Sequence, residues 1–285
     1  MDKKEAGDRY TEIKSRLCRF AENDADIHAV IMIGSYTRKD VPADEFSDLD
    51  VFIVTDKPEK WFSGEYPSLL GKMEISFIEP TLGGGKEKRC VYDKDKDVDM
   101  IVLTPEQFDK ALEEGVLEWV MNRGYNVLYA DSEKFAERAA RYVRTVVSRP
   151  EMSEEEFLNI VGDFYFHNIW ACKKLLRGEL WAAKMCIDGY LKDRLRKMIE
   201  EYCTLTSGTD VWHDGRFIDR WAEPSVLDEL KGCFAHYDTA DCKKALIATH
   251  KLFARLARDV AEKRGYNYPE EAETCAAGYI GAGRQ

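Results

Sequence analysis

The sequence lacks the features of several protein classes. It contains no run of 18 apolar residues, so it predicts no membrane-spanning helix. Its first five residues are mainly charged, which is not typical of a signal peptide. The eight cysteines form no CxxC pair, and the five histidines show no metal-ligand spacing with one another or with cysteine. These absences argue against a disulfide scaffold and a zinc site, and they predict a cytoplasmic protein with reduced thiols.

Positive charge is also in short supply. The chain has 42 Lys and Arg residues against 53 Asp and Glu residues, which gives a formal net charge of −11. A protein that coats nucleic acid needs an excess of cations to bind phosphates, so this balance predicts no nucleic-acid partner and suits a cationic one. The 45% hydrophobic content is enough for a sizeable core, and 285 residues fit one large domain or two ordinary ones.

Strand patterns dominate the first half of the chain. An amphipathic pattern predicts a helix over 8–22. Short apolar or alternating runs predict strands over 27–33, 49–54, 72–78, 100–103 and 127–129. The run 100–103 is wholly apolar, which indicates a strand in the middle of a sheet. Thr104 followed by Pro105 predicts the start of another helix.

Helical periodicity takes over after about residue 133. It predicts helices near 154–177, 179–203, 226–235 and 239–264, the last ending at Gly265. The fold class is therefore α/β (α+β). We expect an N-terminal sheet domain over 1–135, a helical domain over 136–275 and a flexible, Gly- and Ala-rich tail over 276–285. A cleft between two such domains is a common place for a ligand site.

One group of residues indicates chemistry. Gly34 and Ser35 follow the first predicted strand, and Asp48 and Asp50 lie 13 and 15 residues beyond Ser35. Because side chains alternate along a strand, both carboxylates are expected on one face, where a shared proton or a divalent cation would relieve their repulsion. Oxygen ligands favour Mg²⁺. Gly34 would let the backbone approach a phosphate, and Ser35 offers a hydroxyl and an N–H group.

A third carboxylate completes the predicted site. Asp99 directly precedes the apolar run 100–103, so we expect it on the sheet beside Asp48 and Asp50, whereas Asp97 is expected to be solvated. Three carboxylates on neighbouring strands can hold one or two Mg²⁺ ions and leave one group to act as a base. An Asp pair alone is common in loops, so the prediction depends on the whole combination.

Gly34-Ser35, Asp48-Leu49-Asp50 and Asp99 together resemble the signature of the nucleotidyltransferase superfamily. More closely, the chain resembles the aminoglycoside 6-adenylyltransferase (streptomycin adenylyltransferase) family. The similarity is spread over residues 46–50, 54–56, 99–105, 163–164, 216–220, 250–253, 260–262 and 268–270, with Lys173, Arg177 and Glu179. One departure is Tyr36, where the family often has Arg after Gly-Ser, and Arg38 is the candidate to replace that cation.

The resemblance implies a nucleotidyltransferase mixed sheet with flanking helices, followed by a helical bundle. It also implies transfer of AMP from ATP to a hydroxyl of an aminoglycoside such as streptomycin, at position 6, with release of pyrophosphate and resistance to the antibiotic. Asp48 and Asp50 would hold Mg²⁺. Asp99 would take the proton of the attacking hydroxyl and touch the metal.

The resemblance further suggests which other residues bind the two substrates. The terminal phosphates of ATP would contact Gly34 and Ser35. From the helical half, Lys173 and Arg216 could hold the triphosphate, with surface salt bridges as the alternative. Asp163 could face the cationic acceptor, or it could be a solvated helix residue.

Other functions remain open at the level of the sequence. The chain could modify another small molecule or a protein, or it could be a non-catalytic nucleotide-binding module on the same fold. The presence of all three aspartates favours catalysis. We expect no membrane partner, and a monomer or weak dimer.

Overall fold

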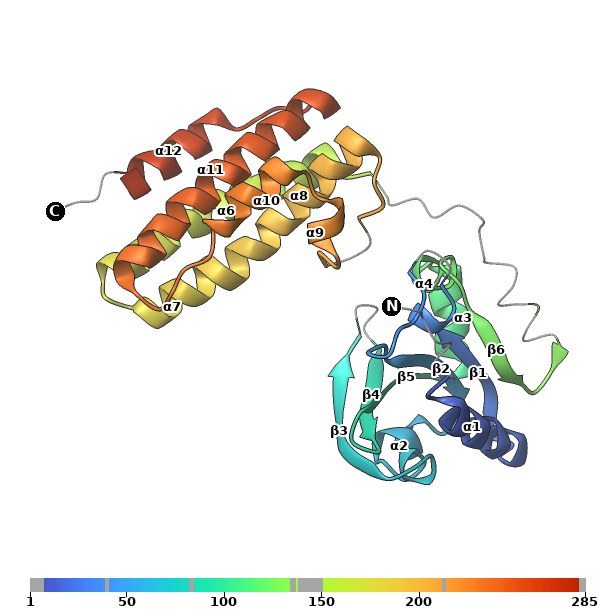
Figure 1. Ribbon diagram of the computed structural model, residues 1–285. Coiled ribbons are helices and arrows are strands. Elements are labelled where there is room, and N and C mark those ends of the chain that lie inside the picture. Colours follow the sequence, from blue (N-terminus) through green and yellow to red (C-terminus); the bar gives the residue numbers. More distant parts are fainter. Residues whose placement is uncertain are drawn as a thin grey trace, which may run out of the picture. The chain divides into compact units, whose positions relative to one another are not determined.

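The computed structural model describes residues 8–38, 41–81, 85–133, 137, 151–211 and 214–281. The chain divides into two compact units, Met1–Arg149 and Pro150–Gln285 (Figure 1). The predicted boundary between 135 and 136 falls where most residues lie outside the described ranges, and it stays a prediction. None of the helices in those ranges is both long and apolar enough to cross a membrane.

A mixed six-stranded sheet forms the centre of the first unit. Its strands are β1 (Ile27–Ile33), β2 (Leu49–Thr55), β3 (Met73–Pro80), β4 (Lys86–Tyr92), β5 (Lys96–Leu103) and β6 (Asn126–Ala130). They lie in the order β3-β4-β5-β2-β1-β6. The β2–β5 pair is parallel and the other pairs are antiparallel. The predicted mixed sheet is confirmed, and β5 is an interior strand, as its apolar run indicated.

Helices cover both faces of this sheet because its inner strands are apolar on both sides. The flanking helices are α1 (Thr11–Asn23), α2 (Pro58–Phe62), α3 (Pro105–Glu113) and α4 (Glu118–Met121). Residues of α1 and α2 share a core with one face of the sheet, and residues of α3 and α4 share a core with the other. The predicted start of α3 is confirmed, because Thr104 and Gln107 form a capping box ahead of Pro105.

The second unit is a helical bundle, as expected. Its helices are α6 (Glu154–Leu176), α7 (Leu180–Met185), α8 (Leu191–Ser207), α9 (Ile218–Trp221), α10 (Pro224–Lys231), α11 (Thr239–Arg264) and α12 (Glu270–Gly281), with a π-helical turn at Cys186–Tyr190. Phe164 of α6 stacks on Phe253 of α11 with 3.6 Å between ring centroids. The core is therefore built across α6 and α11.

The predicted flexible tail over 276–285 is wrong for residues 276–281, which form the end of α12. Ala276 and Ile280 are buried in the core of the bundle, and α12 packs on α6. Small side chains that suggest a loose tail in the sequence here allow one helix to lie close to another. Residues 282–285 lie outside the described ranges.

Candidate active site

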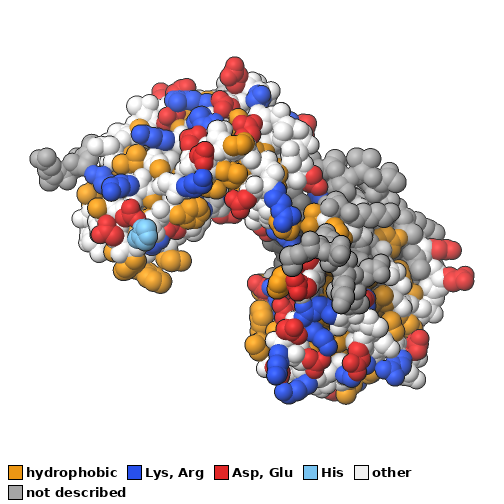
Figure 2. All heavy atoms as spheres, in the orientation of Figure 1, with side chains coloured by type: hydrophobic (Ala, Val, Ile, Leu, Met, Phe, Trp, Pro, Cys, Tyr) orange, Lys and Arg blue, Asp and Glu red, His pale blue; other side chains and the backbone are white. Residues whose placement is uncertain are grey.

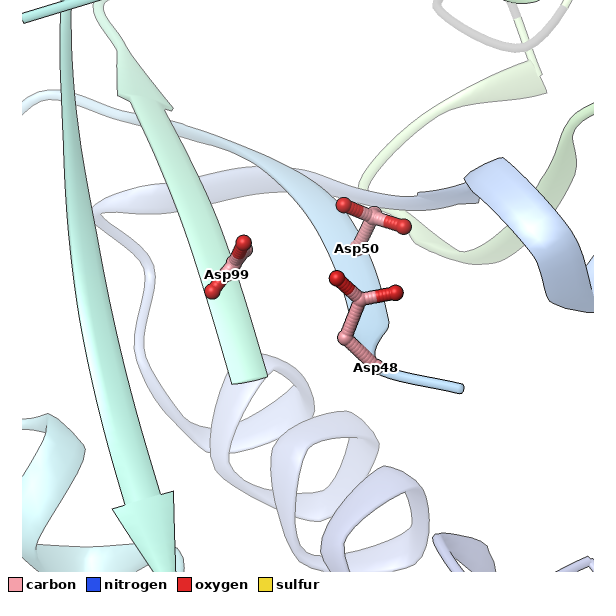
Figure 3. A group of neighbouring side chains, drawn as sticks. All are labelled: Asp48, Asp50 and Asp99. Carbon is pink, nitrogen blue, oxygen red and sulfur yellow. The ribbon is translucent and has the colours of Figure 1, made fainter. Parts of the chain in front are cut away.

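The three predicted carboxylates come together at one end of the parallel β2–β5 pair. Asp50 is the second residue of β2, Asp48 directly precedes that strand, and Asp99 lies in β5. The register places Asp50 opposite Asp99. One ligand oxygen from each carboxylate lies within 4.8 Å of the others, and Figure 3 shows the three groups clustered between the two strands. The sheet register thus joins residues that are about fifty positions apart in the sequence.

These side chains fit a divalent cation. They offer hard oxygen ligands alone, and ligand oxygens around one Mg²⁺ lie up to about 4.2 Å apart. Small side-chain rotations would bring the carboxylates to that spacing. Asp99 is 6% exposed. Burial raises the pKa of its carboxyl above the ordinary value, although the neighbouring Arg89 acts in the opposite direction.

Gly34 is required here for two independent reasons. Its φ of 72° lies in the left-handed region, which side chains disfavour. In addition, a Cβ atom at this position would overlap Oδ2 of Asp50. The turn after β1 therefore approaches the carboxylate cluster so closely that only glycine fits.

The turn that follows β1 also carries a buried hydroxyl, that of Ser35, without a hydrogen-bond partner among the described residues. Gly34–Tyr36 form one 3₁₀ turn. Thr37 holds this turn in place, because its Oγ1 lies 2.9 Å from Gly34 O and 2.8 Å from Gly124 O. A buried polar atom of this kind is typically satisfied by a water or a ligand, so Ser35 fits contact with a phosphate oxygen.

Tyr36 does not imitate the arginine that it replaces in the family pattern. Its ring packs edge-to-face on Tyr10, which directly precedes α1, with 5.4 Å between the ring centroids, and Lys14 Nζ lies 5.4 Å from the centre of the Tyr36 ring. Arg38 is 9% exposed and already interacts with other residues. A role for Arg38 at the phosphates remains a prediction.

Sequence reasoning missed Arg89, the cation beside the cluster. It lies on β4 directly opposite Asp99. Its Nε is 2.8 Å from Asp99 Oδ2, and its Nη2 contacts the same oxygen. No spacing rule pointed to Arg89 because β4 itself, with charged residues at Lys86, Glu87, Lys88 and Arg89, carries no apolar run.

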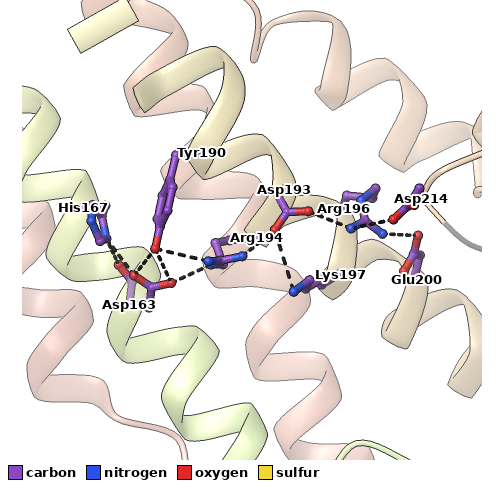
Figure 4. Close-up of polar contacts among 9 residues, drawn as sticks. All are labelled: Asp163, His167, Tyr190, Asp193, Arg194, Arg196, Lys197, Glu200 and Asp214. Atoms are coloured by element: carbon purple, nitrogen blue, oxygen red, sulfur yellow. Dashed lines mark hydrogen bonds and ion pairs between the residues drawn. The ribbon is translucent and has the colours of Figure 1, made fainter. Parts of the chain in front are cut away.

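In the helical unit, Asp163 of α6 accepts several hydrogen bonds at once (Figure 4). Tyr190 Oη lies 2.9 Å from both carboxylate oxygens, Arg194 Nε lies 2.5 Å from Oδ2, and His167 Nδ1 lies 2.7 Å from Oδ1. Burial alone would raise the pKa of Asp163, but the bonds from Arg194 and Tyr190 outweigh it and lower the pKa. The side chain remains 22% exposed. Asp163 is therefore a fixed carboxylate with one accessible side.

Lys173 and Arg216 lie towards opposite ends of the bundle. Lys173 is 19 residues along α6 from Glu154, which corresponds to roughly 28 Å of helix. Arg216 lies near the other end, because the adjacent Gly215 N is 3.1 Å from Glu200 Oε1 in α8. Arg264 links that part of α8 to residue 151, through contacts of 2.8 Å to Glu201 and 3.2 Å to Glu151. Contact of Lys173 and of Arg216 with the triphosphate remains a prediction.

Comparison with known proteins extends over most of the chain. A sequence model of a family described as streptomycin adenylyltransferase matches residues 9–282. An aminoglycoside 6-adenylyltransferase of Bacillus subtilis (strain 168) is 21% identical over 266 residues, which cover 89% of this chain and 90% of that protein. Its counterpart from Staphylococcus aureus is 20% identical over 270 residues, or 90% and 93% of the two chains. The crystal structure of an aminoglycoside 6-adenyltransferase from B. subtilis aligns with 96% of this chain and 99% of its own, at 16% identity and a TM-score of 0.47.

Proposed function

Because the chain belongs to the streptomycin adenylyltransferase family, whose model matches residues 9–282, we propose that it transfers AMP from ATP to a hydroxyl of an aminoglycoside. Membership confirms the resemblance seen in the sequence. The observation that carries the proposal is the carboxylate cluster of Asp48, Asp50 and Asp99 beside the Gly34-Ser35 turn. Streptomycin, modified at position 6 with consequent resistance, is the acceptor that we propose to test first.

The reaction that we propose is an in-line displacement at the α-phosphorus of ATP. The acceptor oxygen forms a bond to phosphorus, the bond to the bridging oxygen breaks, and pyrophosphate leaves. Asp99 takes the proton of the attacking hydroxyl, and its burial beside the cluster supports that role. Asp48 and Asp50, with Asp99, would hold Mg²⁺. When bound, Mg²⁺ neutralises negative charge on the phosphates.

Phosphate contacts are assigned to the turn after β1. Ser35 Oγ would donate to a phosphate oxygen, because the hydroxyl is buried and lacks a partner among the described residues. Arg38 would add a cation at the end of the same turn. From the helical unit, Lys173 and Arg216 would contact the triphosphate.

The acceptor is proposed to be a polycation. The net charge of −11 would raise the local concentration of cationic molecules. Asp163 would contact one cationic group of the acceptor through its accessible side, because Tyr190 and Arg194 hold the carboxylate in one orientation.

The experiment that tests the proposal is pyrophosphate release from the purified protein with ATP and Mg²⁺. The acceptors are streptomycin, kanamycin, gentamicin, spectinomycin and lincomycin, with a reaction lacking acceptor as the blank. We expect release with streptomycin and its loss in Asp99→Asn. Release with a different acceptor would retain the chemistry and change the substrate.

Two other results would redirect the assignment. If no acceptor gives release but ATP with Mg²⁺ still raises the melting temperature, another acceptor such as a protein is indicated. If neither release nor a thermal shift occurs, the catalytic proposal is wrong and a non-catalytic module is favoured.

A further inference from the structure

Arg89 is held by carboxylates from three adjacent strands. Asp99 lies on β5, Glu87 on β4 and Glu79 on β3. Nη1 lies 3.0 Å from Glu79 Oε2, and Nε lies 3.2 Å from Glu87 Oε1 as well as 2.8 Å from Asp99 Oδ2. A guanidinium is planar and presents its N–H groups in a rigid fork, so three partners fix both its position and its plane.

The contacts to Asp99 are asymmetric. Both Nε and Nη2 of Arg89 donate to Oδ2, and Oδ1 takes part in neither bond. Rotation of a carboxylate exchanges its two oxygens, and two charge-assisted bonds to one oxygen oppose that rotation. Arg89 therefore determines which oxygen of Asp99 is left for other ligands.

The sheet register makes this arrangement part of the fold. In one row across the strands, Asp50 of β2 lies opposite Asp99, and Asp99 lies opposite Arg89. Asp99 thus has a metal-ligand candidate on one side and its guanidinium on the other. The side chain of Asp99 is 8% exposed, which leaves little room for water to replace Arg89.

We propose that Arg89 is a positioning residue for Asp99, an inference that rests on the proposed function. It holds Oδ2 and thereby presents Oδ1 to the bound metal and to the acceptor hydroxyl. A carboxylate with a fixed orientation serves both purposes better than a rotating one. In other metal sites, hydrogen-bond partners of the ligands orient those ligands in this way.

The alternative is that Arg89 only balances negative charge. Arg89→Lys separates the two roles, because lysine keeps the charge but lacks the rigid fork. We expect kcat to fall about tenfold or more in Arg89→Lys, while KM for ATP changes less than about threefold. Arg16→Lys is the matched control, since Arg16 pairs with exposed Glu12 on α1 in the same unit. It should retain kcat.

Arg89→Ala provides a second variant. Guanidinium chloride at millimolar concentration should restore part of its kcat, and sodium chloride at the same ionic strength should not. A kcat for Arg89→Lys equal to that of the unmodified protein would contradict the proposal. So would a loss in Arg89→Ala that guanidinium does not reverse in a variant of unchanged melting temperature.

A binding measurement separates this proposal from the proposed function. Titration calorimetry with Mn²⁺ alone needs neither ATP nor acceptor. We expect Arg89→Lys to weaken Mn²⁺ binding about tenfold and Arg16→Lys to leave it unchanged. If the unmodified protein adenylylates none of the acceptors, that weakening would still support the positioning role. Equal Mn²⁺ affinities would overturn it.

Discussion

The two units of the molecule use their carboxylates in opposite ways. In the sheet unit, three aspartates converge within 4.8 Å of one another. In the helical unit, acidic and basic side chains alternate along one network, from Asp163 through Arg194 and Asp193 to Arg196 and Glu200 (Figure 4). On the visible surface of both units, charges of the two signs intermingle (Figure 2). The like-charge cluster is therefore a local feature of the sheet.

The difference indicates that the charges of the two units serve different purposes. Converging like charges oppose folding until a cation binds, so a site of this kind serves chemistry at the expense of stability. Alternating charges in hydrogen-bond contact favour the folded state and hold side chains in fixed orientations. Substitutions in the sheet cluster should therefore reduce activity more than stability. Substitutions in the helical network should measurably reduce stability.

The largest expected effect is that of Asp50→Asn. We expect pyrophosphate release to fall about 10³-fold, because a charged ligand of the metal is lost. Without Mg²⁺ the melting temperature should stay the same or rise, because repulsion within the cluster decreases. The pyrophosphate assay measures the first effect, and calorimetric melting without Mg²⁺ measures the second. A large fall in the metal-free melting temperature would contradict the comparison between the units.

Gly34→Ala should have the next largest effect. The new Cβ would overlap Asp50 Oδ2 and would force a side chain into the left-handed region at φ 72°. We expect activity to fall about 10²-fold as Asp50 is displaced, and stability to fall by about 1–2 kcal/mol. Gly162→Ala is the control, because outside the adjacent residues and the nearby backbone of α6 itself no atom lies within 4 Å of a Cβ at that position. Equal activities of the two variants would contradict the close approach of the turn to the cluster.

Asp163→Asn tests the helical side of the comparison. Arg194 and His167 would lose the negative charge that they contact, so the melting temperature should fall by roughly 2–4 °C, as ~1 kcal/mol does in a domain of this size. KM for the cationic acceptor should rise about tenfold. Asp228→Asn, which breaks an exposed pair with Lys231, is the control. A fall in melting temperature without a change in KM would remove Asp163 from the proposed acceptor site.

The smallest effect concerns His28, which lies between two carboxylates in the sheet unit. Its Nε2 is 3.0 Å from Asp56 Oδ2 and its Nδ1 is 2.7 Å from Asp131 Oδ2. Burial would lower the pKa of His28, but the two aspartates outweigh it and raise the pKa above the ordinary 6.5. The stabilisation is then complete below the unfolded-state pKa and is lost as the pH rises through the higher folded-state pKa.

The measurement is the melting temperature of the protein and of His28→Asn at pH values from below 6.5 to well above it. We expect the melting temperature of the protein to exceed that of the variant by roughly 1–3 °C at the acidic end, and the two melting temperatures to converge as the pH rises. A difference that stays constant with pH would show that the charge of His28 is not involved. This case limits the comparison, because it is a pair of carboxylates in the sheet unit that stabilises the fold.

Much of the fold could be predicted because local patterns determine it. The apolar run at Ile27–Ile33 and the long stripe at Thr239–Arg264 match β1 and α11 in both boundaries. Strand alternation grouped Asp48 with Asp50, and the position of Asp99 directly before the apolar run 100–103 grouped it with them. The strand β4 was missed because its first four residues are all charged, and the end of α12 was missed because Ala and Gly suggest a loose tail.

What local pattern could not supply is pairing between distant strands. The contact of Arg89 with Asp99 depends on the register of β4 against β5. In the same way, the separation of Lys173 from Arg216 depends on how α6 and α8 pack. Each residue type was plausible for its proposed role, but tertiary structure decides which of them lie together.

The register of β5 also restricts how the length of the chain can vary. Val98 and Met100 face the core that α1 shares, while Asp99 between them faces the cluster. An insertion or deletion of one residue within Lys96–Val98 would turn Asp99 into that core and bring an apolar side chain to its place. The β4–β5 turn, where Asp93 and Lys94 already adopt positive φ, does not have this constraint. Among related sequences, we expect length changes to accumulate in the turn and to be absent from the three residues before Asp99.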